Sequence, residues 1–513
     1  MSLHQAPCVS IVGAGPGDPG LISVRGRRRL EHADVVVYDH DVHARMLRLA
    51  RADAEKIDVG PAAPRPLDQD AISLLLVEKA RENKLVVRLK CGDPFVFDSG
   101  GKEALFLHEQ GVPFEVVPGI PATVGAPAYA GIPITYPGAG DLVVLVRGHE
   151  GDADAAPDVD WSRLAGLGGT LVCHASARQI GPLIHALVAN GRPQDETAAL
   201  IYAGTTPRQE TITGTLADIA EHARPHERAM LVVGRPVGLR EHIRWFDDRP
   251  LFGRRIVVTR SREQAGEFVD LLEDRGAEAI LAPTIRITEP EDPAALDRAC
   301  QDASTYDWIV FTSANGVDAF MRRVLALGDI RDLKGVRFCA IGPSTAERLT
   351  RLGIRVDLVP DEYRAEAIVE ALKVGDAVAG KRFLLARADI ARELLADDLR
   401  AAGAEVTEVA AYRTLLAGGE RDADHDVYRM LLDRQIDAVT FTSASTVKNF
   451  ARIFGEDQVA DLLRTTVVAS IGPVTAEAAQ QLGIATTVMP QRYTIPDLVN
   501  ALVAHFALNA VRA

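Results

Sequence analysis

The stretch Asp307-Trp308-Ile309-Val310-Phe311-Thr312-Ser313 returns 130 residues later as Asp437-Ala438-Val439-Thr440-Phe441-Thr442-Ser443. The tripeptide Ile341-Gly342-Pro343 returns at the same offset, and a similar offset of 127 residues relates two segments upstream. An offset this long indicates two duplicated domains, because the repeats of a solenoid are far shorter. Two similar domains that face each other make a cleft. The second half of the chain is therefore predicted to bind its ligand between two lobes.

The composition is that of an ordinary soluble protein with several domains. The 513 residues suffice for roughly three or four domains. A content of 47% hydrophobic and 25% charged residues is typical of globular chains. The net charge of −14 argues against a general nucleic-acid binder, which carries a basic surface. An anionic substrate has to be met by local positive groups, because the overall field repels it.

The cysteines and the apolar segments bear on localisation. Five scattered cysteines without a CxxC pair indicate reduced thiols rather than disulfides or a zinc site, so no metal is expected. No apolar stretch approaches the ~20 residues of a membrane span. The amino terminus lacks the basic and apolar regions of a secretory signal. We expect a cytoplasmic protein that does not act at a membrane.

Short apolar runs alternate with amphipathic stretches, which predicts an α/β protein with mostly parallel strands. The expected buried strands are Val9–Val12, Val35–Tyr38, Val86–Leu89, Leu142–Leu145 and Met230–Val233, and two expected helices are Ile72–Glu82 and Gly101–Gln110. The segment Trp245–Gly253 breaks this rhythm and indicates the main domain boundary. A softer boundary is expected near Thr135–Asp141.

In the second half, Thr-Ser and Ile-Gly-Pro follow strands and precede helix starts. Ligands bind at the carboxyl ends of parallel strands in open α/β sheets. Ser344–Glu347 has the form of a capping box. Two interpretations stay open and are compatible: these residues cap helices, or the helix amino termini also bind carboxylates across the cleft.

The first half contains an ordered set of glycine-rich motifs. Gly13–Asp18 follows a strand but is no dinucleotide fingerprint, because Asp18 stands where the third glycine belongs. The later motifs are Leu89–Phe97, Gly100-Gly101, Val117–Ile120, Tyr129–Pro133, Gly204–Gln209 and Leu231–Gly234. Together, over about residues 8–246, this half resembles the tetrapyrrole methylase family, most closely uroporphyrinogen-III C-methyltransferase.

The resemblance implies two α/β domains with S-adenosyl-L-methionine between them, and a homodimer as the usual state. It places Pro16, Gly92, Asp93 and Gly204 at the cofactor, and Asp39 as proton acceptor. Methyl transfer to a pyrrole carbon is an in-line displacement in which positioning supplies most of the acceleration. A carboxylate can then collect the proton. The alternative for Asp39 is a turn residue after a strand.

The chain departs from the methylase pattern at several positions. Pro61 stands where the family has a lysine assigned as proton donor, and Cys91 replaces a glycine near the cofactor. Ser99 and Pro137 stand where the family has arginines. Further departures are Pro121, Tyr136 and Ala175. Three possibilities stay open: an active methyltransferase, a degenerate non-catalytic or regulatory domain, and a methylase with a different substrate.

The second half, over about residues 252–507, resembles uroporphyrinogen-III synthase. The motifs that carry the resemblance are Val258–Arg260, Phe311–Gly316, Ile341–Pro343, Ala411–Thr414, Phe441–Ser443 and Ile471–Pro473 with Thr475. It implies closure of hydroxymethylbilane to uroporphyrinogen III, with loss of water, inversion of ring D and no cofactor. The synthase product is the methylase substrate. The fusion is thus expected to be bifunctional, with precorrin-2 as a product towards sirohaem and cobalamin.

The substrate closes spontaneously to the wrong isomer, so the enzyme mainly has to control the shape of the substrate. A wide cleft with groups that bind carboxylates and with one weak acid suits this task. Tyr412 matches the family's proposed acid, and a phenol with a pKa of about 10 is protonated at neutral pH. Arg260 and Arg387 end equivalent strands and are expected to contact substrate carboxylates. The other expected contacts are Ser313, Ser344, Thr345, Ser443 and Thr475. The alternatives are salt bridges within a domain for the arginines and packing at the hinge for Tyr412.

The expected domains are 1–246, with subdomains of about 1–135 and 141–246, a linker at 247–253, the synthase at 254–507 and a tail at 508–513. The resemblance implies that two crossing segments join the lobes. Lobe one then contains residues 254–285 with 416–507, and lobe two contains residues 286–412.

Overall fold

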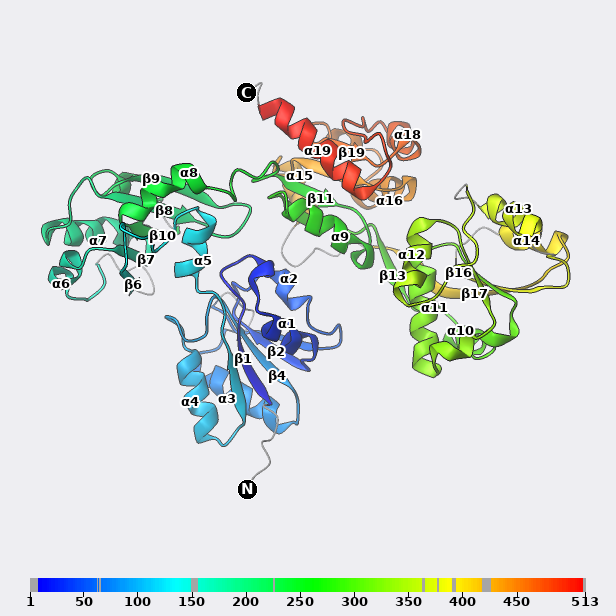
Figure 1. Cartoon of the computed structure of the whole chain (residues 1–513), viewed down its shortest axis with the longest axis horizontal. Coiled ribbons are helices and arrows are strands. Elements are labelled where there is room, and N and C mark those ends of the chain that lie inside the picture. Colours follow the sequence, from blue (N-terminus) through cyan, green and yellow to red (C-terminus); the bar gives the residue numbers. More distant parts are fainter. Residues whose placement is uncertain are drawn as a thin grey trace.

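The computed structural model describes residues 8–61, 63, 66–148, 156–224, 227–361, 365–375, 378–389, 394–417 and 426–510. Within these residues the strands form four sheets, each packed with its own helices, and the sheets belong to separate units in Figure 1. Short 3-10 turns lie at Pro19–Leu21, Ile219–His222, Arg235–Leu239, Ala303–Thr305 and Ile330–Leu333. No helix in the described ranges is both long and apolar enough to cross a membrane.

The first sheet is wholly parallel, in the order β3 (Glu55–Asp58), β2 (Val35–Tyr38), β4 (Val86–Lys90), β1 (Val9–Gly13) and β5 (Phe114–Val117). Its helices are α1 (Val24–Glu31), α2 (Ala44–Leu47), α3 (Gln69–Arg81) and α4 (Gly100–Glu109). β1 and β4 are buried throughout, as the continuous apolar runs of a sheet covered on both faces require. The strands and helices expected here are confirmed to within a few residues.

The second sheet corrects two expectations. Its order is β6 (Val143–Arg147), β7 (Thr170–Ser176), β10 (Arg228–Val233), β8 (Thr197–Tyr202) and β9 (Glu210–Thr215). Only the β6–β7 pair is parallel, so the expectation of mostly parallel strands is wrong here. Short loops can join antiparallel neighbours, whereas parallel strands need long crossovers. The expected buried strand at Leu142–Leu145 is a half-exposed edge, with Leu142 42% exposed. The helices of this unit are α5 (Ala122–Tyr129), α6 (Trp161–Gly166), α7 (Ala177–Ala189) and α8 (Arg240–Ile243).

The third sheet, in lobe one, combines strands far apart in the sequence. Its parallel order is β12 (Glu278–Leu281), β11 (Arg255–Val258), β18 (Ala438–Phe441) and β19 (Val467–Ser470). The helices are α9 (Arg262–Glu273), α15 (Val427–Leu432), α16 (Ala444–Phe454), α17 (Val459–Leu462), α18 (Pro473–Gln481) and α19 (Ile495–Ala510).

The fourth sheet, in lobe two, has the order β13 (Ile285–Thr288), β17 (Glu405–Leu416), β16 (Arg382–Ala388), β14 (Trp308–Phe311) and β15 (Arg337–Ala340). The helices are α10 (Pro293–Gln301), α11 (Ala314–Leu327), α12 (Pro343–Arg351), α13 (Ala365–Gly375) and α14 (Leu394–Ala401). β13 pairs antiparallel with β17, and Ala417 N–H donates to the carbonyl of Thr284 at 3.1 Å. The two segments that cross between the lobes therefore lie side by side.

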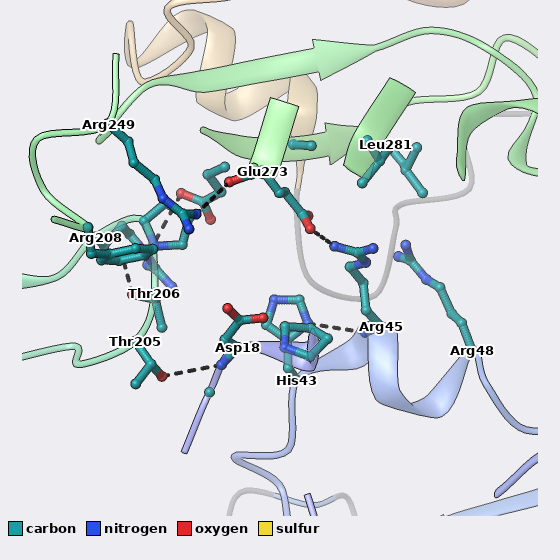
Figure 2. A pocket seen from close by; sticks show the side chains of 17 residues that line it. Asp18, His43, Arg45, Arg48, Thr205, Thr206, Arg208, Arg249, Glu273 and Leu281 are labelled. Atoms are coloured by element: carbon teal, nitrogen blue, oxygen red, sulfur yellow. Dashed lines mark hydrogen bonds and ion pairs between the residues drawn. The ribbon is translucent and has the colours of Figure 1, made fainter. Parts of the chain in front are cut away.

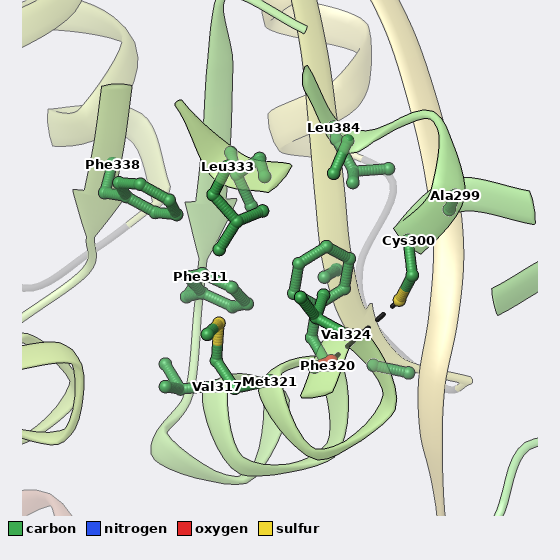
Figure 3. Packing of buried hydrophobic residues seen from close by; sticks show 14 of the residues in the cluster. Ala299, Cys300, Phe311, Val317, Phe320, Met321, Val324, Leu333, Phe338 and Leu384 are labelled. Carbon is green, nitrogen blue, oxygen red and sulfur yellow. Dashed lines mark hydrogen bonds between the residues drawn. The ribbon is translucent and has the colours of Figure 1, made fainter. Parts of the chain in front are cut away.

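The duplication extends to the packing of each core. In lobe two, Phe311 at the end of β14 meets Phe320 of α11 edge to face, with ring centroids 5.7 Å apart, and Met321 and Val324 fill the same cluster (Figure 3). In lobe one, Phe441 meets Phe450 in the same way at 5.3 Å. Each pair fixes the helix that follows the Thr-Ser motif against its sheet, and so fixes the residues at the start of that helix.

Candidate active sites

Three glycines bring neighbouring strand ends of the first sheet into close contact. A Cβ atom on Gly13 would lie 2.6 Å from the carbonyl oxygen of Gly92, and one on Gly119 would lie 2.2 Å from the same oxygen. Gly92 also has φ +65, a conformation that favours glycine. The ends of β1, β4 and β5 can therefore meet only because these positions carry no side chain.

The expected cofactor residues gather around the first turns of α5. Pro16 packs on Gly125, where a Cβ would lie 2.6 Å from the proline Cγ, and Gly204 packs on Ala126 in the same way at 2.5 Å. The Asp93 carboxylate accepts the N–H groups of Gly119 at 3.0 Å and Phe95 at 2.8 Å. Loops distant in the sequence thus meet at one place between the first two sheets.

Asp39 follows β2 and is held by two cations from β4. Its Oδ1 accepts from Nη2 of Arg88 at 2.5 Å, and its Oδ2 lies 3.8 Å from Nζ of Lys90. The side chain of Asp39 is 29% exposed, whereas those of Arg88 and Lys90 are almost wholly buried. The arrangement fixes one carboxylate at the end of the sheet with one side open, as a proton acceptor requires.

Glu103 of α4 completes this buried network. Its Oε1 lies 3.2 Å from Nε of Arg88 and 3.2 Å from Nζ of Lys90, and it accepts from Gln69 Nε2 at 3.0 Å. Burial by itself raises the pKa of the Glu103 carboxyl, but the charges of Arg88 and Lys90 outweigh it and lower the pKa. The sequence analysis did not single out Glu103, Arg88 or Lys90. The signal was present, because Arg88 and Lys90 interrupt an otherwise apolar strand.

At two of the positions that depart from the methylase pattern, Cys91 and Pro121, the residue suits the local backbone conformation. Cys91 is absent from the described non-glycine residues with positive φ, so it replaces a glycine without strain of that kind. Burial raises the pKa of its thiol to about 12 and keeps it protonated. Pro121 is the N-cap of α5 with φ −70, a value that proline favours. Pro61 follows Gly60, which packs on His40, and His40 Nδ1 lies 2.7 Å from Asp58 Oδ2.

In the second half, Tyr412 of β17 and Ser313, the N-cap of α11, meet within lobe two. Their hydroxyl oxygens are 2.9 Å apart, and Ser313 Oγ also accepts the N–H of Gly316 at 3.0 Å. Ser313 is thus both a helix cap and a partner of the tyrosine. Tyr412 is only 7% exposed, and burial raises the pKa of its phenol, so it stays protonated well above neutral pH.

Arg260 and Arg387 occupy equivalent places but have different partners. Arg387 forms an ion pair with Glu408 of the adjacent strand, as the alternative of a salt bridge within the domain anticipated. Arg260 donates to Oε1 of Gln264 at 3.1 Å, and no carboxylate of the described residues forms an ion pair with it. Burial lowers the pKa of Arg260, which marks a desolvated cation. The charge of Glu267 offsets this effect in part, without forming a close ion pair. A partly buried guanidinium of this kind is suited to receive an anion.

The remaining expected contacts stand at helix starts. Ser443 caps α16 and bonds to Ser445 Oγ at 2.9 Å. Thr345 and Thr475 are 3% and 4% exposed. The side chain of Ser344 lies outside the described residues. The expected capping box is wrong, because α12 begins at Pro343 with Gly342 as N-cap and Glu347 pairs with Arg351 instead. Proline at the first helical position sets this start.

A third feature is a pocket at the junction of the two halves (Figure 2). Arg45 of α2 forms ion pairs with Glu273, the last residue of α9, and with Asp270 at 3.3 Å. Arg249 donates to the carbonyl of Glu273 at 3.2 Å. The same pocket is lined by Asp18, next to the motif that holds Pro16. Helix α2 of the first half therefore contacts lobe one directly.

The described residues contain no group of three or more His, Cys, Asp or Glu side chains arranged to hold a metal ion. All five cysteines are free thiols.

Comparison with known proteins assigns both halves. Residues 9–220 match the family model "Tetrapyrrole (Corrin/Porphyrin) Methylases", and residues 266–500 match "Uroporphyrinogen-III synthase HemD". The "Porphyrin biosynthesis protein HemD" of Ruminiclostridium josui is 34% identical over 501 residues, which cover 96% of this chain and 97% of that protein. The chain belongs to this family of methylase–synthase fusions.

Two further relatives match part of the fusion. The uroporphyrinogen-III C-methyltransferase of Bacillus subtilis is 33% identical over 70% of this chain and 75% of its own length. The solved structure of the uroporphyrin-III C-methyltransferase of Thermus thermophilus, complexed with S-adenosyl homocysteine, is 33% identical. It covers 45% of this chain and 99% of that one, with a TM-score of 0.39. The methylase half of the fusion contains the residues matched by the first family model, and the synthase half contains those matched by the second.

Proposed function

We propose that this protein is a bifunctional enzyme of tetrapyrrole biosynthesis. Its synthase half closes hydroxymethylbilane to uroporphyrinogen III with inversion of ring D and loss of water. The observation that supports this assignment is a set of polar contacts that runs from Arg260 in lobe one through Gln264 to Asn315 in lobe two, beside the Ser313–Tyr412 pair. Membership of the fusion family supports it.

The chemistry of the synthase follows from these groups. Tyr412 donates a proton to the departing hydroxyl, and Ser313 orients the phenol. Arg260 binds a substrate carboxylate, and Ser443, Thr345, Thr475 and Ser344 supply further contacts at the helix starts. Arg387 contributes less, because Glu408 already neutralises it. The cleft acts mainly by holding the substrate in the folded shape that leads to the inverted closure.

The methylase half is proposed to methylate uroporphyrinogen III to precorrin-2. S-adenosyl-L-methionine supplies the methyl group when bound. Pro16, Gly92, Asp93 and Gly204 are proposed to hold it, which is supported by their close packing around α5 and the neighbouring strand ends. Asp39, fixed by Arg88 and Lys90, accepts the proton released from the pyrrole carbon.

The alternative is a methylase-like domain that binds the cofactor without turnover. Pro61 is the observation that favours it, because proline cannot replace the lysine that the family uses as proton donor. We further propose a homodimer through the methylase half and action in the cytoplasm, which the free thiols suit.

One coupled reaction tests these assignments. Hydroxymethylbilane is generated in place, full-length protein and S-adenosyl-L-methionine are added, and products are separated by isomer and methylation state. Methylated type III product is expected. Unmethylated type III product would support the synthase and the alternative for the methylase half. Only the spontaneous type I isomer, from folded protein, would refute the synthase assignment.

A further inference from the structure

Gln264, in the first turn of α9, bridges the two lobes of the synthase half. Its Oε1 accepts from Nη2 of Arg260 at 3.1 Å within lobe one. Its Nε2 donates to Oδ1 of Asn315, at the start of α11 in lobe two, at 2.9 Å. Each end of one side-chain amide is therefore bonded to a different lobe.

Asn315 brings this contact near the proposed acid. It lies two residues after Ser313, whose hydroxyl is 2.9 Å from that of Tyr412. Hydrogen bonds thus run from Arg260 through Gln264 to Asn315, and Ser313 at the same helix start contacts Tyr412.

A glutamine amide is suited to this place by its hydrogen-bonding groups. Arg260 can only donate and needs an acceptor, whereas the Asn315 oxygen needs a donor. Glutamine offers both at the end of one side chain. Glutamate would lose the donor, and leucine would lose both groups. Arg260 uses one N–H in this bond and keeps its other donors for a carboxylate.

We propose that Gln264 is a positioning residue of the synthase, which sets lobe one against lobe two so that Arg260 and Tyr412 act on the same substrate molecule. The proposal rests on the proposed synthase function. Two domains joined by two crossing segments can open and close, and a bond between the facing surfaces selects the closed arrangement. Gln264 therefore acts through Arg260 and Asn315, and does not itself take part in proton transfer.

The test compares Gln264→Leu, Gln264→Glu and the exposed control Gln481→Ala of α18 in the full-length protein supplied with hydroxymethylbilane. Gln264→Leu is expected to lower kcat/KM about tenfold, the size of two lost hydrogen bonds. The share of type III product is also expected to fall, because the slower enzymatic closure then competes less well with spontaneous closure to the type I isomer. Gln264→Glu is expected to raise KM, since its carboxylate occupies Arg260. Gln481→Ala behaves as the wild type.

A double variant separates positioning from simple stabilisation. If Gln264 acts through Asn315, the combination of Gln264→Leu with Asn315→Ala is no slower than the slower single variant. The proposal is overturned if the losses in rate of the two single variants multiply in the double variant. It is also overturned if Gln264→Leu keeps the kcat/KM and the share of type III product of the wild type. If that variant does not fold by circular dichroism, an unchanged KM in Gln264→Glu overturns it instead. Wild-type protein that makes only type I product refutes the synthase function itself, a separate outcome.

Discussion

At the scale of single residues, equivalent positions of the duplicated lobes differ in their partners. Ser313 and Ser443 both cap helices, yet of the two only Ser313 bonds to a tyrosine in the described structure. Arg387 forms an ion pair with Glu408, whereas Arg260 donates a hydrogen bond to Gln264. The duplicated lobes therefore have similar helix starts and strand ends, but the side chains at these places make different contacts.

Tyr412→Phe tests the proposed acid. We expect kcat to fall by roughly 100-fold, the lower range for a lost general acid, with type III product still formed because the cleft still shapes the substrate. The measurement is the initial rate and isomer ratio from hydroxymethylbilane. Burial raises the pKa of Tyr412, so the wild-type rate should show no loss from phenol ionisation up to pH 9 or so. A complete loss of type III product from folded protein would contradict shape control as the main factor.

At the scale of elements, β4 brings Arg88 and Lys90 into the interior between Asp39 and Glu103. Two cations in a central parallel strand would be costly without carboxylates on the neighbouring elements. The network therefore couples the stability of the first sheet to the position of the proposed proton acceptor.

Glu103→Gln is expected to destabilise the methylase half by roughly 3 kcal/mol at pH 7, because it removes the fully buried carboxylate shared by Arg88 and Lys90 and leaves only their more exposed partners, Asp39 and Asp98. The folded-state pKa of Glu103 is lowered, so its contribution is present above the unfolded pKa of about 4.3 and is lost as the pH falls through the lower folded value. The difference in unfolding free energy from the wild type should thus narrow on acidification below pH ~4. Denaturant unfolding at several pH values measures it, and a difference that stays constant with pH would show that the charge of Glu103 is not responsible.

At the scale of the whole molecule, the two halves are packed together and not merely tethered. Phe246 at the end of the methylase half meets Phe252 of the linker edge to face, with ring centroids 5.3 Å apart, and Arg208 lies 3.8 Å from Glu278 of lobe one. Leu251 is fully buried, and Arg45 pairs with Glu273 of α9. Helix α9 carries Gln264 at its other end, about 14 Å away at 1.5 Å per residue. One helix therefore touches both the synthase cleft and the junction with the methylase half.

Arg45→Ala is expected to loosen this junction without unfolding either half. Amide hydrogen exchange at the carboxyl end of α9 should rise about fivefold, which corresponds to about 1 kcal/mol for a partly exposed ion pair. Arg28→Ala, an exposed arginine of α1, is the matched control and should leave exchange unchanged. Equal exchange in Arg45→Ala and the wild type would show that the ion pairs do not hold the halves together.

The sequence by itself determined the α/β class, the duplication in the second half and the two family resemblances, because these depend on local periodicity and on motifs that are contiguous in the chain. It also predicted that Tyr412 and Arg260 matter, but only as separate positions. The tertiary structure alone decided the antiparallel pairing of β8, β9 and β10, the true start of α12 and the different partners of Arg260 and Arg387. It also decided the contacts of Glu103 and Gln264 with residues of other elements. Such contacts depend on how the sheets and lobes pack. The sequence pattern does not show which distant side chain neutralises a buried charge or forms a given hydrogen bond.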